Sequence, residues 1–227
     1  MLTEIVLTVS ESKRLIAKGV AAMPAVRKAL AHGTVAIATG STNAYVVEEV
    51  TGRRIEKQKY MTGATLPAGV SREGLLSRDL PDVVLKDGKP LENVATTDAV
   101  KSMGVGDVFI KGANALHYET RRAGVLIGHP TGGTVGAILG TIIARRITLV
   151  VPVGLEKCVA QPIEHVWRFL ASDPECERPL PSLWPLDAEI VTEIEALRIL
   201  TGVDAVQSAA GGVGGAEGGV RLVARRG

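Results

Sequence analysis

Four short segments combine glycine with hydroxyl, amide or cationic side chains, which together are suited to holding a small anion. Glycine lets the backbone approach a ligand closely, and backbone N–H groups at the start of a helix attract negative charge. Each segment follows an apolar run typical of a buried strand. The sequence therefore predicts a site for a phosphorylated or carboxylated metabolite, formed by Thr39-Gly40-Ser41-Thr42-Asn43, Lys111-Gly112-Ala113-Asn114, His129-Pro130-Thr131-Gly132-Gly133-Thr134 and Gly154-Leu155-Glu156-Lys157.

The first segment is the most informative, because Gly40 is followed by two hydroxyl residues, Ser41 and Thr42, at a predicted strand-to-helix turn. Such a turn places N–H groups and hydroxyls around one small anion. The Gly-x-x-x-x-Gly-Lys-Ser/Thr spacing of a nucleotide loop is absent, and no Gly-x-Gly-x-x-Gly follows a strand. The alternative is that Gly40 and Ser41 only form a tight turn and a helix cap.

Lys111 ends a predicted strand directly before glycine, where its ammonium can neutralise a phosphate or a developing enolate oxygen. The alternative is an ordinary surface lysine. His117 and Glu119 follow within eight positions and can transfer protons if they face the pocket. His129 is a further candidate, although the histidine of a Gly-His-Pro turn often forms a hydrogen bond with the backbone of that turn.

The elements expected to position these groups alternate between strands and helices. Buried strands are predicted at 34–38, 108–110, 124–127 and 147–153. Helices are predicted at 11–31 with a break at Pro24, at 44–50 closed by Gly52, at 98–103, at 134–146 and at 162–170. This alternation favours an α/β fold with a doubly wound, mostly parallel sheet flanked by helices. We expect a single domain over 1–227 with a small irregular or α+β appendage, a small inserted subregion at 53–95, and a proline-rich excursion at 178–185.

Composition narrows the class of protein. The chain has 227 residues, of which 46% are hydrophobic but only 3% aromatic, so its core must consist mainly of Val, Ile, Leu and Ala. The net charge of +2 is spread along the chain, which argues against a nucleic-acid partner. No secretory signal or bilayer-length apolar run is seen, so the protein is expected in the cytoplasm and off the membrane. Cys158 and Cys176 lack metal-type spacing, so no metal site is predicted.

The order of these motifs resembles a known family. The stretch that ends at Val50, LAHGTVAIATGSTNAYVVEEV, is similar to the start of ribose-5-phosphate isomerase of the A type, whose superfamily includes glucosamine-6-phosphate deaminases and CoA transferases. Ala38-Thr39-Gly40-Ser41-Thr42 stands where that isomerase holds the sugar phosphate. The segment 110–116, IKGANAL, is similar to the family's lysine-bearing glycine-rich segment. The resemblance implies that Lys111 binds substrate and that Glu119 acts as a base.

The sequence departs from that family at two motifs. The family's Asp-Gly-Ala-Asp is reduced to Asp98-Ala99-Val100-Lys101, and the Glu-Asn-Gly of CoA transferases is matched only by Glu92-Asn93-Val94. The resemblance implies a cofactor-independent sugar-phosphate isomerase-like enzyme in which Lys111, Glu119 and Asp98 are catalytic. The alternatives are a non-catalytic ligand-sensing module of the same fold, a CoA transferase-like protein, and a scaffolding subunit. The expected partners are a small anionic ligand and other copies of the chain as a homo-oligomer.

Overall fold

The main element of the fold is a six-stranded mixed sheet in the order β10-β8-β5-β2-β3-β4. The computed structural model describes residues 1–70, 79–173, 175 and 180–225. The four strands from β10 to β2 are parallel to their neighbours, as their apolar composition predicts, whereas β3 and β4 are antiparallel. The strands of this sheet are β2 (Thr34–Ile37), β3 (Val83–Lys86), β4 (Lys89–Pro90), β5 (Val108–Ile110), β8 (Thr148–Pro152) and β10 (Glu189–Val191).

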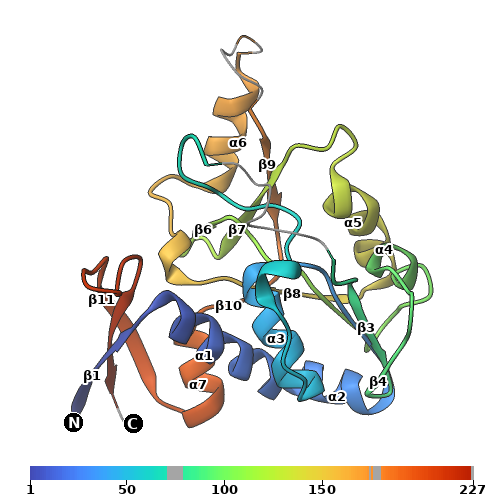
Figure 1. Cartoon of the computed structure of the whole chain (residues 1–227), viewed down its shortest axis with the longest axis horizontal. Coiled ribbons are helices and arrows are strands. Elements are labelled where there is room, and N and C mark those ends of the chain that lie inside the picture. The colour runs from blue at the N-terminus through green and yellow to red at the C-terminus, as the bar shows by residue number, and fades with distance from the viewer. Residues whose placement is uncertain (71–78, 174, 176–179, 226–227) are drawn as a thin grey trace.

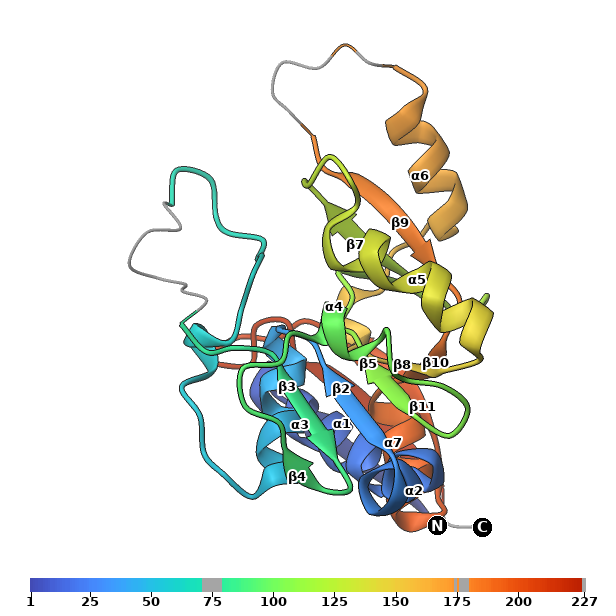
Figure 2. The ribbon, with the colours of Figure 1, turned by 90° about the vertical axis from the view of Figure 1, so that its right-hand side faces the viewer.

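Seven α-helices are described, and all of them except α6 lie around the main sheet, on both of its faces. On β2, Val35 and Ile37 belong to a core shared with α1, α2 and α3, whereas Ala36 belongs to a core shared with α5. Figure 2 shows the same division, with α5 on one side of β2 and β5 and α1 to α3 on the other. The α/β class and the mostly parallel sheet are therefore confirmed, while the doubly wound arrangement stays a prediction. The helices are α1 (Val9–Ala22), α2 (Pro24–His32), α3 (Ser41–Thr51), α4 (Thr96–Ala99), α5 (Gly133–Arg145), α6 (Ile163–Ala171) and α7 (Glu193–Thr201).

Two smaller antiparallel sheets complete the fold (Figure 1). One has the order β1-β12-β11 and pairs the two ends of the chain, since Leu2 lies opposite Arg225. The other has the order β6-β7-β9 and, with α6, forms a lobe beside the main sheet. The strands are β1 (Leu2–Leu7), β6 (Ala115–His117), β7 (Arg122–Ile127), β9 (Ser182–Leu186), β11 (Asp204–Ala210) and β12 (Val220–Arg225), and two short 3-10 helices are η1 (Lys57–Lys59) and η2 (Leu155–Lys157).

Several local predictions are confirmed. The first helix breaks at Pro24, and Gly52 ends α3 in the left-handed conformation with φ of 68°. Within 53–95, β3 and β4 extend the main sheet, and the small inserted subregion stays a prediction. Residues 71–78 of that range, together with 178–179 of the proline-rich range and Cys176, lie outside the described residues, whereas Cys158 is an exposed free thiol. Within the described part of the chain, no helix is both long and apolar enough to cross a bilayer.

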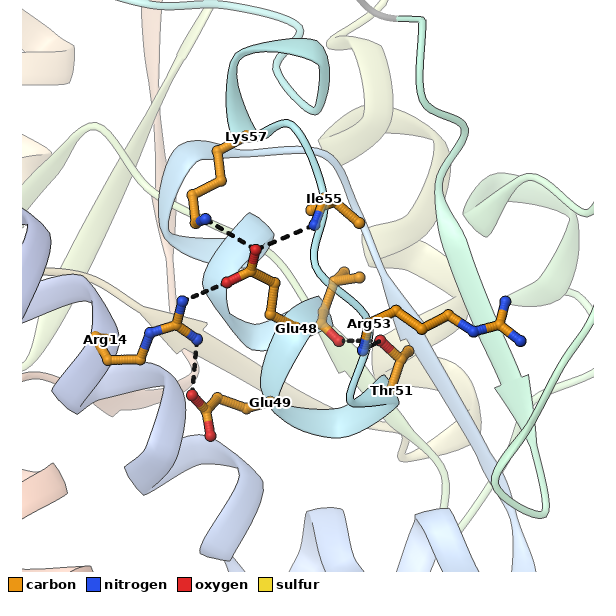
Figure 3. Close-up of polar contacts among 8 residues, drawn as sticks. Arg14, Glu48, Glu49, Thr51, Arg53, Ile55 and Lys57 are labelled. Carbon is orange, nitrogen blue, oxygen red and sulfur yellow. Dashed lines mark hydrogen bonds and ion pairs between the residues drawn. The ribbon is translucent and has the colours of Figure 1, made fainter.

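A buried carboxylate fastens α3 to its surroundings. The side chain of Glu48 is 4% exposed and lies between Arg14 of α1 and Lys57 of η1 (Figure 3). Glu48 Oε1 accepts hydrogen bonds from Lys57 Nζ at 2.8 Å and from the Ile55 amide at 3.1 Å. Burial alone would raise the pKa of Glu48, but the hydrogen bonds from Lys57, Arg14 and Ile55 lower it to about 2.

Glu48→Gln is therefore expected to lower the free energy of unfolding by about 2–3 kcal/mol at pH 7, because it leaves two cations without their shared partner. A carboxylate whose pKa is lowered by folding stabilises the fold at pH values above its unfolded pKa near 4.5. This stabilisation is lost as the pH falls toward 2. The difference between wild type and variant should therefore shrink over this range in urea titrations. Glu49→Gln is the control, because Glu49 pairs only with Arg14, at 2.7 Å, among the described residues, and should cost less than about 1 kcal/mol. An equal loss in both variants would contradict the assignment.

Candidate functional site

A cleft of about 480 Å³ lies where the strands β2 and β5 end, and all four predicted segments contribute to it. Its described lining contains the lysines Lys111 and Lys157 and no aspartate or glutamate. The starts of two helices, α3 and α5, also line it, so their unpaired amides add positive potential. The predicted site residues in the lining are Thr39, Gly40, Ser41, Thr42, Lys111, Gly112, Asn114, His129, Gly132, Gly133, Thr134 and Lys157.

Hydrogen bonds to residues outside the β2–α3 loop hold this loop in place. The Gly40 amide donates to the carbonyl oxygen of Tyr60 at 2.9 Å, and the Thr39 amide donates to Asp82 Oδ1 at 3.3 Å. Because α3 begins at Ser41, the next amides have no partner within the helix. Thr42 lines the cleft but is only 3% exposed, and its Oγ1 is buried without a hydrogen-bond partner in the described part of the chain. A buried hydroxyl without a partner is costly, and an anion in the cleft would supply one.

Asn43 does not line the cleft, contrary to prediction. It is fully buried, and its Nδ2 donates to the carbonyl oxygens of Ala38 at 2.7 Å and Ile110 at 3.5 Å. The third position of a helix that starts at Ser41 turns inward, so the amide side chain ties the ends of β2 and β5 together. Asn43 thus positions the loop instead of contacting a ligand.

Two lysines approach the cleft from neighbouring strands. Lys111 follows β5, and its Nζ has one described hydrogen bond, to the Gly112 carbonyl oxygen at 3.4 Å. Burial lowers the pKa of Lys111 to about 8, an effect that Asp82 opposes and Lys157 strengthens. Lys157 Nζ donates to the Ala113 carbonyl oxygen at 2.9 Å, and burial lowers its pKa as well. The side of the cleft next to β5 and β8 therefore holds two poorly solvated ammonium groups.

The third segment forms the start of α5. Gly132 and Gly133 have φ of 84° and 55°, a conformation that favours glycine, and Thr134 follows them in the lining. Thr131 does not line the cleft, because it closes a small turn in which its amide donates to His129 Nδ1 at 3.3 Å. This is the backbone-bonded turn considered as the alternative for His129. The indole of Trp184 on β9 packs against Gly132, where an added Cβ would lie 2.8 Å from it.

Two of the three predicted catalytic residues lie away from the cleft. Asp98 is exposed on α4 and pairs with Lys101 at 2.7 Å. Glu119 is exposed in the turn between β6 and β7, because β6 carries the chain away from the cleft after Ala115. His117 also lies outside the lining, with its Nδ1 2.8 Å from Thr120 Oγ1. Glu156 is likewise absent from the lining.

Three further groups contribute to the site without a motif that predicts them. Asp82 orders the site, because its Oδ2 accepts hydrogen bonds from the Thr96 amide at 3.1 Å and the Thr96 hydroxyl at 2.6 Å while Oδ1 accepts one from Thr39. Tyr60 is buried and donates to the Ile37 carbonyl oxygen at 2.6 Å. Residues 62–65 form a second wall, where Thr62 Oγ1 lies 2.5 Å from Thr39 Oγ1. The position of Asp82 directly before β3 was the available signal, since an antiparallel neighbour of β2 starts where β2 ends.

Comparisons with models of protein families, with curated proteins and with solved structures found no match to this chain. The resemblance to the isomerase family stays a prediction from the motifs. Of the described residues, no three histidine, cysteine, aspartate or glutamate side chains cluster as metal ligands would.

Proposed function

We propose that this chain binds a small phosphorylated or carboxylated metabolite in the cleft between the β2–α3, β5, α5 and η2 segments. The observation that carries the proposal is that the charge of the cleft is of one sign. Its described lining has two lysines, two helix starts and no carboxylate. A cavity of about 480 Å³ is within the size range of small-ligand sites.

The geometry supports binding more than it supports isomerase chemistry. Moving a proton between adjacent carbons needs a base within hydrogen-bond reach of the substrate, and neither Glu119 nor Asp98 lines the cleft. A CoA transferase-like reaction needs a carboxylate nucleophile, and none lines the described cleft. A ligand-sensing module needs only the anion-binding groups, so it is the favoured alternative of those considered.

Thermal unfolding in inorganic phosphate and in ribose 5-phosphate tests the proposal, with chloride at equal ionic strength as the reference. A ligand of the native state raises the melting temperature. Thr42→Val removes the hydroxyl while keeping the side-chain shape, and Lys157→Met removes a cleft cation. Each is expected to weaken phosphate affinity roughly tenfold or more, because a hydrogen bond to a charged group is lost.

Lys18→Met is the matched control. Lys18 is exposed on α1 and lines a separate cavity of about 350 Å³ together with Arg14, Arg53 and Arg54. Its substitution should leave the phosphate-induced shift unchanged. If Lys18→Met removes the shift, or if Thr42→Val and Lys157→Met both retain it, the anion binds outside the cleft and the proposal is wrong.

A further inference from the structure

A lysine amine that is poorly solvated in a ligand cavity and forms no salt bridge is a nucleophile toward carbonyl carbon. Lys111 meets the geometric part of this description. It lines the cleft and is half-buried, its one described hydrogen bond is the long one to Gly112, and no salt bridge of Lys111 lies among the residues that the structure describes. The charge of Asp82 favours the ammonium form of Lys111, but within the described part of the chain no salt bridge fixes the ammonium group in place.

Burial favours the neutral amine, although the charge of Asp82 opposes it by raising the pKa of Lys111. Lys157 approaches the same loop, because its Nζ donates to the Ala113 carbonyl oxygen, and a second cation nearby disfavours protonation of the first. Burial acts in the same direction and brings the pKa of Lys111 to about 8. At pH 7 roughly a tenth of the molecules would then carry a free amine, which is far more than for an exposed lysine.

We propose that Lys111 forms an imine with a ketone or aldehyde that also carries a phosphate or carboxylate. This inference rests on the proposed function, because the anionic group must first be held in the cleft. Lys111 Nζ attacks the carbonyl carbon, and the electron pair of the C=O bond moves to oxygen. The amides at the start of α3 and the ammonium of Lys157 face the cleft where that oxygen develops charge.

The atoms of this step balance without a cofactor. The nitrogen loses both amine protons, the carbonyl oxygen gains two protons and leaves as water, and a C=N bond replaces the C=O bond. Lys157 can supply a proton to the departing oxygen and recover one from the nitrogen. No change of oxidation state occurs, so no oxidant or reductant takes part.

Reduction of the imine with borohydride in the presence of dihydroxyacetone phosphate, and separately of pyruvate, tests the inference. Mass spectrometry of the whole chain should find one addition per molecule, and peptide mapping should place it on Lys111. Acetone, which lacks the anionic group, should label Lys111 at least tenfold more slowly. The labelling rate should rise from pH 7 to about pH 8 and then level off, because only the neutral amine reacts.

Lys111→Arg keeps the charge but should lose the adduct, whereas Lys18→Met should keep it at the wild-type rate. Lys111→Met serves as a second loss variant, and circular dichroism melts establish that each variant is folded. Labelling spread over exposed lysines, equal labelling by acetone, or an adduct retained in Lys111→Arg would overturn the inference. If dihydroxyacetone phosphate raises the melting temperature but leaves no adduct on Lys111, the imine is excluded while the proposed function stands. If it does neither, both fail.

Discussion

Lys111→Met is expected to raise the free energy of unfolding at pH 7 by about 1–3 kcal/mol, even though it removes a proposed ligand-binding group. Folding buries this ammonium, and the cost is expressed as the fall of its pKa from 10.5 to about 8. Methionine has a similar length and no charge, so the cost disappears. Replacing a functional residue often stabilises a protein, because a binding site holds some groups in energetically unfavourable surroundings.

The pH dependence gives the sharper test of this prediction. Below pH 8 the folded and unfolded chains both carry the proton, so the destabilisation in the wild type is complete. Between about pH 8 and 10.5 the unfolded chain holds a proton that the folded chain has lost, so wild-type stability rises with pH. The advantage of Lys111→Met should therefore shrink over that window in urea titrations. Lys18→Met should show no such dependence, and a variant destabilised equally at all pH values would contradict the account.

Gly136→Ala is expected to lower the free energy of unfolding by about 2–4 kcal/mol and to disturb the start of α5. A Cβ at Gly136 would lie 2.1 Å from the Thr131 carbonyl oxygen and 3.1 Å from its carbon, so the backbone of the cleft loop must move. Because Gly132 and Gly133 follow that carbonyl, phosphate binding should weaken together with stability.

Gly140→Ala, one turn further along α5, is the matched control. An added Cβ there meets nothing within 4 Å. Alanine favours a helix over glycine, so this variant should gain about 0.5–1 kcal/mol. Denaturant unfolding of both variants, with phosphate titrations, separates the clash from the general effect of replacing a helical glycine. Similar behaviour of the two variants would show that the close approach to Thr131 is relieved at little cost.

The main sheet could be predicted because its strands carry their signal locally. The runs at β2, β5 and β8 are apolar except for the threonine that begins β2 and β8, and they are largely buried on both faces. The strands missed by sequence reasoning depend on distant partners. β1 becomes a strand by pairing with β12 at the other end of the chain, and β9 contains Pro185, which normally argues against a strand. β9 tolerates that proline because it is the edge strand beside β7.

The part of the candidate site that lines the cleft could also be predicted, whereas the positions of the proposed catalytic residues could not. Lys111 and Ser41 follow strands that lie side by side, so their meeting follows from the sheet. Glu119 was chosen by sequence order, and its position depends on β6 turning back into β7, a hairpin whose three-residue first strand gave no pattern. Asn43 was placed on the correct loop but on the wrong side of it, because one residue of helical rotation separates a lining side chain from a buried one.

The contact between Trp184 and Gly132 has a practical consequence for optical measurements. The chain has two tryptophans, and both lie in the lobe of β9 and α6, away from the main sheet. Indole emission therefore reports on this lobe, and in the case of Trp184 on the glycines that begin α5. A change in emission intensity on adding a ligand would signal movement at that junction.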